Sequence, residues 1–499
     1  MDLTFYFSGL HLVLNAGVIL SIAAGTLYGI IFGAMPGLTA TAGIALIIPI
    51  TYGMDSVIAI SFLLGTYLGG VYGGCIPAIL INIPGAPGAI MTMLDGYPMS
   101  QQGKSGLAIG LATVCSFLGG LFSVFLLAVL SLPLAKLALS FSAQEYTMVA
   151  FMGLSVLAYV SPKSTIKGLI VGIIGLLIST IGQDPLTAYP RFAFDIPSLY
   201  GGVSFIPAMI GLYGLSSVFE ESEKFKEEIT LISQTVSKLP GLKLLYKLKN
   251  VILRSSIIGV IIGAIPGTGA SIAAIIAYGV SKSTSKNSDE FGKGSVEGIA
   301  APESANNAAT GGALIPTMAL GIPGCSATAV MLGAFILHGF QPGPLLFVDH
   351  PEFCSSMFLS LFISNIFLLV FGLLGAQYIA RVVLTPKYIL VPLICIFCIV
   401  GAYGVNYNFF DVAAMIFFGL FGYVLKKLDF SIAPMVLGII LGPIFETNLR
   451  RSLILSRGDW STFFTRPISL GILCLTIIIM VLPRLFYFKK FDKKYGMNY

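Results

Sequence analysis

The chain has 499 residues, of which 56% are hydrophobic and only 10% are charged. With a mean hydropathy of +0.93, this composition excludes an ordinary water-soluble domain and a disordered chain, and it predicts a multi-pass membrane protein. The net charge of +6 comes from Lys and Arg gathered in a few loops. It therefore indicates membrane orientation, and we expect no nucleic-acid partner.

The first apolar segments show an interrupted pattern. Residues 10–32 predict a membrane helix that ends at Gly33 and Pro36-Gly37. Residues 38–55 are short and contain Pro49, so we expect a re-entrant half-helix rather than a full span. A segment at 58–80, broken by glycines and Pro77, leads into a loop at 82–98, and simpler helices are expected at 106–131, 146–160, 168–182 and 201–219.

A charged stretch then divides the chain. Residues 223–250 predict a cytoplasmic linker, after which the pattern begins again. Pro36-Gly37 matches Pro266-Gly267 at an offset of 230 residues, and Pro84-Gly85 matches Pro323-Gly324 at an offset of 239. We expect an internal duplication with a first half at 1–222, a second half at 251–448, and a loop, one extra membrane helix and a basic cytoplasmic tail at 449–499.

The positive charges indicate that the two halves have opposite orientations. Lys163 and Lys167 mark a first-half loop whose second-half counterpart at 404–410 has no base. Conversely, Lys426 and Lys427 lie in the counterpart of a first-half loop that has a single Arg. Because basic loops favour the cytoplasmic side, the exchange predicts inverted-topology repeats. The same scheme places the N-terminus outside.

A Pro-Gly break in each half is a candidate anion site. Such a break stops one helix and starts another, whose first N–H groups have no partner within the helix. Near the middle of the membrane, these groups and the positive end of the helix dipole would suit a carboxylate. A kink that only allows close helix packing is the alternative. The candidate residues are Pro36, Gly37, Leu38, Thr39, Ala40 and Thr41 and, in the second half, Pro266, Gly267, Thr268, Gly269, Ala270 and Ser271.

A second break in each half is expected to face the same site. The first half has Asn82, Pro84 and Gly85, and the second half has Pro323 and Gly324. Their matching positions suggest that the two breaks form a symmetric frame around the substrate.

The polar segment 297–324 has no counterpart of equal polarity in the first half. Asn306, Asn307 and Thr310 offer oxygen ligands for a hard cation such as Na⁺, with hydrogen bonding between helices as the alternative. Adjacent asparagines cannot share one helix face, so one can bind while the other packs. Glu303 is either a proton or ion site, or part of a solvated ion pair at the cytoplasmic mouth near Lys293.

Four blocks resemble the signature blocks of the TctA family, the large membrane subunit of tripartite tricarboxylate transporters. They are GAMPGLTATAGIALIIPITYGMD, YGGCIPAILINIPGAPGAIMTMLDGYPM, IPGTGASIAAIIAYGVSKSTSK and FGKGSVEGIAAPESANNAATGGALIPTMALGIPG. The resemblance implies a permease of the bacterial cytoplasmic (inner) membrane. It also implies a small TctB-like membrane subunit, a periplasmic TctC-like binding protein, a driving cation gradient and citrate-like carboxylates as substrates.

We therefore expect an importer of citrate-like tri- and dicarboxylates without a bound cofactor, with Na⁺ as the coupling cation and H⁺ as the alternative. The fold class is an all-α polytopic membrane protein with two inverted repeats and one extra C-terminal helix. Two discontinuous regions per half predict an elevator-like motion, with a possible homodimer through the scaffold helices.

Two other functions remain open from the sequence alone. The first is a passive anion channel or pore subunit. The second is an intramembrane enzyme, for which Asp95 and Glu303 are the available carboxylates. The chain has no HExxH, GxSxG or P-loop motif, which argues against an enzyme and against ATP-driven transport. Arg450 and Arg451 either attract an anion or a partner protein, or lie in a solvated loop.

Overall fold

The protein is built almost entirely from helices. The computed structural model describes residues 3–35, 37–160, 165–223, 237–382, 385, 387–478 and 480. Within these residues, six helices are long and apolar enough to cross a membrane: Ala16–Ala34, Ser56–Ile81, Ser105–Ala138, Pro351–Leu374, Tyr388–Asn406 and Phe409–Lys427. The prediction of an all-α polytopic membrane protein is confirmed.

The chain divides into two compact units, which are described separately. Unit 1 comprises Met1–Leu139 and Ser204–Val424, and unit 2 comprises Ser140–Val203 and Leu425–Tyr499. Each unit thus draws on both predicted halves of the chain, and the second stretch of unit 1 begins with residues 204–222 of the first half.

The first stretch of unit 1 alternates short and long helices. In chain order they are α1 (Leu3–Phe7), α2 (Leu10–Val13), α3 (Ala16–Ala34), α4 (Ala40–Thr51), α5 (Ser56–Gly73), α6 (Cys75–Ile81), η1 (Pro87–Ala89), α7 (Ile90–Gln101) and α8 (Ser105–Ala138). Helix α4 has only 12 residues, in agreement with the short segment expected after the first break.

The second stretch of unit 1 begins with a helix that contains a π-helical turn. Its elements are α11 (Phe205–Met209), η3 (Ile210–Leu215), α12 (Ser216–Ser222), α13 (Leu242–Ala264), α14 (Gly269–Thr284), η4 (Ser288–Glu290), α15 (Val296–Leu320), α16 (Ser326–Leu337), α17 (Leu346–Asp349), α18 (Pro351–Leu374), α19 (Ala376–Val382), α20 (Lys387–Asn406) and α21 (Phe409–Lys427). Part of the predicted linker, residues 224–236, lies outside the described residues. Its end, from Leu242 onward, is already helical in α13.

At each helix break, one matched pair of residues has the same backbone conformation in both halves. Gly37 and Gly267, which match at the offset of 230, have φ angles of 85° and 81°. Glycine adopts this left-handed region without steric cost. Asn82 and Gly321, which match at the offset of 239, end α6 and α15 in left-handed conformations with φ of 59° and 69°. Each break is therefore repeated at the level of single residues.

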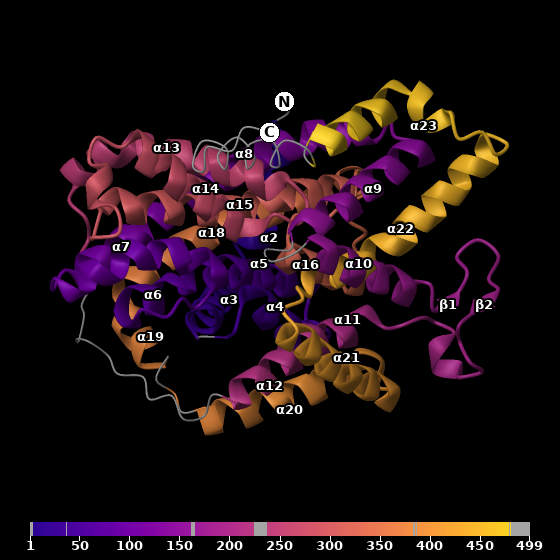
Figure 1. Ribbon diagram of the computed structural model, residues 1–499, viewed down its shortest axis with the longest axis horizontal. Helices are drawn as coiled ribbons and strands as arrows, with labels where there is room; N and C mark the ends of the chain where they lie inside the picture. The colour runs from indigo at the N-terminus through magenta and orange to yellow at the C-terminus, as the bar shows by residue number, and fades with distance from the viewer. Residues whose placement is uncertain are drawn as a thin grey trace, which may run out of the picture. The chain divides into compact units, whose positions relative to one another are not determined.

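Helix α15 lies at the centre of unit 1. All of its residues from Gly298 to Ala319 are buried, because α8 covers one side and α13 and α14 cover another (Figure 1). Small residues allow this close packing, since a Cβ atom at Gly119 of α8 would overlap the backbone of Ser304. A helix buried on all sides can hold polar groups away from lipid and water.

Unit 2 combines several helices, including the apolar helix Pro467–Ile478, with a small hairpin. Its elements are α9 (Ala143–Val160), α10 (Thr165–Ser179), β1 (Gly182–Gln183), β2 (Pro190–Arg191), η2 (Pro197–Leu199), α22 (Ala433–Leu455) and α23 (Thr462–Thr465). Strands β1 and β2 pair antiparallel. Helices α10 and α22 approach closely, because a Cβ atom at Gly175 would overlap the backbone carbonyl of Met435.

Candidate functional site

The two breaks of the second half lie against each other. The N–H of Gly267 donates to the carbonyl of Gly324 at 2.8 Å. A Cβ atom at Gly269, the first residue of α14, would lie 3.6 Å from Cβ of Cys325, the N-cap of α16. The N-termini of α14 and α16 therefore converge. This arrangement brings together N–H groups that have no partner within their helices.

The second break has equivalent neighbours in the two halves. A Cβ atom at Gly85 would overlap the carbonyl of Gly33 and lie 2.9 Å from Cα of Gly74. At Gly324 the same atom would meet the carbonyl of Gly263 at 2.7 Å and Cα of Ala313 at 2.6 Å. Gly263 and Ala313 occupy the positions that match Gly33 and Gly74. The breaks therefore share packing as well as backbone angles.

The two halves also contact each other crosswise. Helix α4 packs on α16, and α14 packs on η1. Tyr67 of α5 places its hydroxyl 3.3 Å from Sγ of Cys325 in the second half. Asn306, at the matching position of α15, places Oδ1 so close to Gly88 that a Cβ there would overlap it. Each long central helix thus reaches the second break of the other half.

The residues of the first breaks differ in their surroundings. Pro36 lies outside the described residues, Gly37 is exposed, Leu38, Ala40 and Thr41 are buried, and Thr39 caps α4 by accepting from Ala42 N–H at 3.3 Å. In the second half, Pro266 is buried and Gly267, Thr268, Gly269, Ala270 and Ser271 are half-buried. The Thr268 hydroxyl bonds the carbonyls of Ile262 and Ile265 at the end of α13.

The residues of the second breaks are also unequally exposed. Asn82 is exposed, Pro84 is half-buried, and Gly85, Pro323 and Gly324 are buried. Thr328 accepts from the N–H of Cys325 at 3.0 Å and so helps to cap α16.

A carboxylate lies at the break of the first half. A Cβ atom at Gly37 would overlap the side chain of Glu221, which is 7% exposed on α12. Glu221 therefore touches the backbone just before α4, close to the start of that helix. The sequence did not single out this residue, because no local pattern relates position 221 to position 37.

The three predicted cation ligands have different environments. Asn306 donates from Nδ2 to the carbonyl of Val71 at 3.1 Å. The hydroxyl of Thr310 donates to the backbone carbonyl of Asn307 at 2.6 Å. The side chain of Asn307 is completely buried, and neither its Oδ1 nor its Nδ2 has a hydrogen-bond partner.

Glu303 is a fully buried carboxylate. The hydroxyl of Thr92 in α7 donates to Oε1 at 2.5 Å, and the hydroxyl of Ser116 in α8 donates to Oε2 at 2.7 Å. Of the two placements left open by the sequence, the solvated ion pair at a mouth does not fit this burial. Thr92 and Ser116 were missed because single hydroxyl residues are common in membrane helices.

Asp95 has a structural environment. Its Oδ1 accepts from the N–H groups of Gly292, Gly294 and Ser295 at 2.8 to 3.0 Å. Its Oδ2 accepts from the Tyr278 hydroxyl at 2.9 Å. The carboxylate thus holds the loop that precedes α15. These hydrogen bonds give Asp95 a structural role that does not require it to be catalytic.

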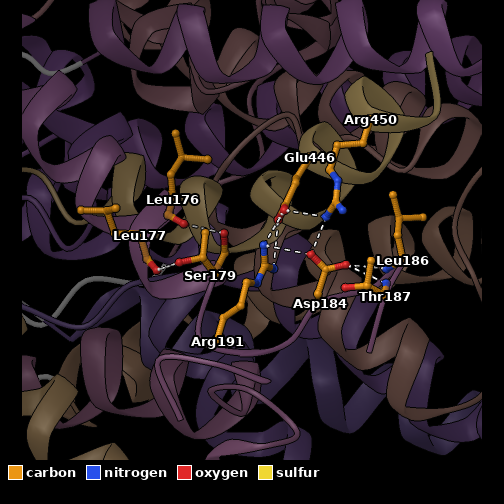
Figure 2. Close-up of polar contacts among 10 residues, drawn as sticks. Leu176, Leu177, Ser179, Asp184, Leu186, Thr187, Arg191, Glu446 and Arg450 are labelled. Carbon is orange, nitrogen blue, oxygen red and sulfur yellow. Dashed lines mark hydrogen bonds and ion pairs between the residues drawn. The ribbon is translucent and has the colours of Figure 1, made fainter. Parts of the chain in front are cut away.

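Unit 2 contains a compact group of charged residues, shown in Figure 2. Arg191 donates to both carboxylate oxygens of Glu446, at 2.5 and 3.2 Å. Arg450 bonds Asp184 and lies 3.4 Å from Glu446. The N–H of Thr187 and the guanidinium of Arg450 hold the pKa of Asp184 well below its usual range. Arg450 is therefore engaged by acids of its own chain.

The fold and the broken helices define a polytopic membrane protein with polar groups buried inside its helical bundle. Residues 19–437 match the model of the tripartite tricarboxylate transporter TctA family. The chain belongs to this family, whose members are components of tripartite tricarboxylate transporters rather than enzymes. No solved structure matches the chain.

Two relatives from Agrobacterium vitis are similar to the chain. One, named "Uncharacterized 52.8 kDa protein in TAR-I ttuC' 3'region", is 36% identical over 462 residues, which are 92% of this chain and 92% of the relative. The other, named "Uncharacterized protein in TAR-II ttuC' 3'region", is 41% identical over 227 residues, which are 46% of this chain and 94% of the relative.

Proposed function

We propose that the protein is the permease of a tripartite importer for citrate-like tri- and dicarboxylates in the bacterial inner membrane. It accepts substrate from a periplasmic binding protein, works with a small membrane subunit, and is driven by a cation gradient, with Na⁺ as the coupling ion and H⁺ as the alternative. The observation that carries this proposal is the match to the TctA family over residues 19–437, a range that contains all four helix breaks.

The breaks provide groups suited to an anion. In the second half, the converging N-termini of α14 and α16 offer backbone N–H groups and the positive ends of two helix dipoles. Ser271 and Ser326 lie in the first turns of these helices and add hydroxyls. A carboxylate is bound well by such donors without any neighbouring Lys or Arg.

The repeated geometry supports an inverted duplication. The matched φ angles, the matched neighbours of Gly85 and Gly324 and the crosswise contacts are all expected when two copies of one unit surround a shared site. The exchange of basic residues between corresponding loops supports the inverted orientation. The two compact units, each drawn from both halves, agree with a transport unit that moves against a scaffold, and the scaffold helices could then form a homodimer.

Uptake of labelled citrate into proteoliposomes tests the proposal. The protein is reconstituted with its small subunit, the binding protein is added outside, and an inward Na⁺ gradient is imposed and then collapsed. Accumulation that needs both the gradient and the binding protein is expected. Accumulation without a gradient would contradict coupling, and a substrate-independent single-channel current would establish the passive channel instead.

A further inference from the structure

The binding of an anion at the helix breaks does not explain why unit 1 contains the buried carboxylate of Glu303. It lies in the middle of four packed helices, since α15 contacts α7, α8, α13 and α14, and its side chain is completely buried. A buried carboxylate is costly to ionise unless a positive charge or several strong donors compensate it.

The partners of Glu303 are neutral. Thr92 and Ser116 each donate one hydroxyl hydrogen bond to one carboxylate oxygen. The titratable groups that interact electrostatically with it are Tyr72, Cys75 and Cys115, none of which can carry a positive charge. Among the described residues, Glu303 forms no ion pair with Lys, Arg or His. No described side chain supplies a positive charge to Glu303, so its ionised form would need a cation from outside the protein.

Asn307 provides an independent indication of a ligand. It lies four residues after Glu303, so the two side chains share one face of α15, roughly 6 Å apart at Cβ. This face is turned toward α7 and α8, because Thr92 and Ser116 donate to Glu303. Gly311, four residues after Asn307, also abuts Ser123 of α8. A fully buried amide with all its polar atoms unpartnered is rare in folded proteins, and a bound polar species would satisfy it.

We propose that Glu303 and Asn307 hold the coupling Na⁺ ion between α8 and α15. The carboxylate supplies charge and oxygen ligands, the Oδ1 of Asn307 supplies a neutral oxygen ligand, and the hydroxyls of Thr92 and Ser116 fix the orientation of the carboxylate. A monovalent ion fits best, because Glu303 alone balances one positive charge. No group of three or more His, Cys, Asp or Glu that could hold a metal ion occurs among the described residues.

This inference rests on the proposed function and refines its cation site. Asn306 and Thr310 are not part of the proposed Na⁺ site. Asn306 contacts Val71 and Gly88, and the Thr310 hydroxyl already bonds the backbone of Asn307. Asn306 nevertheless links the two sites, since it neighbours Asn307 in the chain and touches η1 at the second break of the first half. An ion bound beside Asn307 would thus influence how η1 packs next to the proposed anion site.

Na⁺ binding to the purified chain tests the site without transport. The midpoint of thermal unfolding is measured in detergent as NaCl replaces choline chloride at constant ionic strength. We expect Na⁺ to raise the midpoint of the wild type. Glu303→Gln keeps the shape of the side chain and removes its charge, and Asn307→Ala removes the amide. Each should weaken the apparent Na⁺ affinity at least about tenfold.

Glu297→Gln is the matched control, because it makes the same chemical change in the first turn of the same helix, at a half-buried position. It should leave the Na⁺ affinity unchanged. If Glu303→Gln fails to fold, Asn307→Ala decides the question, since it leaves the carboxylate and its two hydroxyl partners in place.

Three outcomes would overturn the proposal. Unchanged Na⁺ affinity in Asn307→Ala or in folded Glu303→Gln would make these groups structural. If Na⁺ does not raise the unfolding midpoint of the wild type, but acid does, and the effect of acid is lost in Glu303→Gln, the site binds a proton. Greater stabilisation by Ca²⁺ or Mg²⁺ than by Na⁺ would identify a divalent site. Na⁺ binding through Glu303 without citrate accumulation in proteoliposomes would refute the importer and leave the site intact.

Discussion

The helix breaks of the two halves share left-handed residues and packing neighbours but differ in their polar partners. Gly37 and Gly267 share a left-handed conformation, and Gly85 and Gly324 share their packing neighbours. The break of the second half is closed by a backbone hydrogen bond from Gly267 to Gly324, whereas that of the first half is touched by the carboxylate of Glu221. The packing of the breaks is repeated in the two halves, whereas the polar groups beside the breaks differ between them.

The central helices show the same contrast. Helix α15 carries Glu303, Asn306 and Asn307 where the matching positions of α5 carry Leu64, Tyr67 and Leu68. Substitutions of the repeated glycines at the breaks should therefore have similar effects in both halves. Substitutions of the polar groups should have an effect in one half only. Four predictions use this distinction, beginning with the largest expected effect.

Adding a methyl group at the second break should be severely destabilising in both halves. Gly85→Ala and Gly324→Ala would each drive Cβ into backbone atoms that cannot move aside, and we expect each to lower the free energy of unfolding by about 3 kcal/mol or more. Denaturation in mixed micelles measures this loss. Gly279→Ala, in a helical position with nothing within 4 Å, should instead be about 1 kcal/mol more stable. Tolerance of only one of the two break variants would contradict a shared frame.

Removing Asp95 should be next in size. Asp95→Ala leaves three backbone N–H groups before α15 without their acceptor, and we expect a loss of about 3 kcal/mol. Tyr278→Phe removes one of the four hydrogen bonds and should cost about 1 kcal/mol. Hydrogen exchange should locate the change in residues 292–295. Equal losses for the two variants would show that the charge of Asp95 is unimportant there.

Neutralising Glu221 should change substrate affinity rather than stability. Under the proposed function, this carboxylate competes with the substrate for the break of the first half. Glu221→Gln should then lower the apparent KM for citrate about fivefold, equivalent to about 1 kcal/mol. Uptake at varied citrate concentration measures this effect. Glu220→Gln, one residue earlier on α12, is the control. A higher KM in Glu221→Gln would mean that the carboxylate assists binding.

The smallest effects are expected at the matched pair Asn306 and Tyr67. Asn306→Ala removes one buried hydrogen bond, to Val71, and should cost about 1 kcal/mol while weakening citrate uptake. Tyr67→Phe removes the contact to Cys325, and should cost less because sulfur is a weak hydrogen-bonding partner. Membrane insertion should be unaffected in both variants. Unaltered uptake by Asn306→Ala would return Asn306 to a packing role.

The sequence was informative about the breaks because proline and glycine act locally. Pro-Gly pairs end helices wherever they occur, so the boundaries near Gly37, Gly85, Gly267 and Gly324 could be predicted. The short length of α4 followed from the same signals. The basic residues of 242–250 predicted the end of a linker, and in the structure they continue without a break into the rest of α13.

The environment of Glu303 could not be predicted, because burial depends on which helices cover a residue. Its chain neighbours include Glu297 and Lys293, which suggested an aqueous mouth. In the structure, α7 and α8 from the first half cover it. Glu221 and Gly37 meet over 184 residues of sequence, and no local pattern reveals such a contact.

The composition of the two compact units has a consequence for biosynthesis. Unit 2 joins Ser140–Val203 to Leu425–Tyr499, so its first helices leave the ribosome more than 200 residues before their partners. Until then, α9 and α10 must persist without α22. Two fragments cut between positions 223 and 237 would each hold part of both units, so we expect neither to assemble unless the other is synthesised in the same cell.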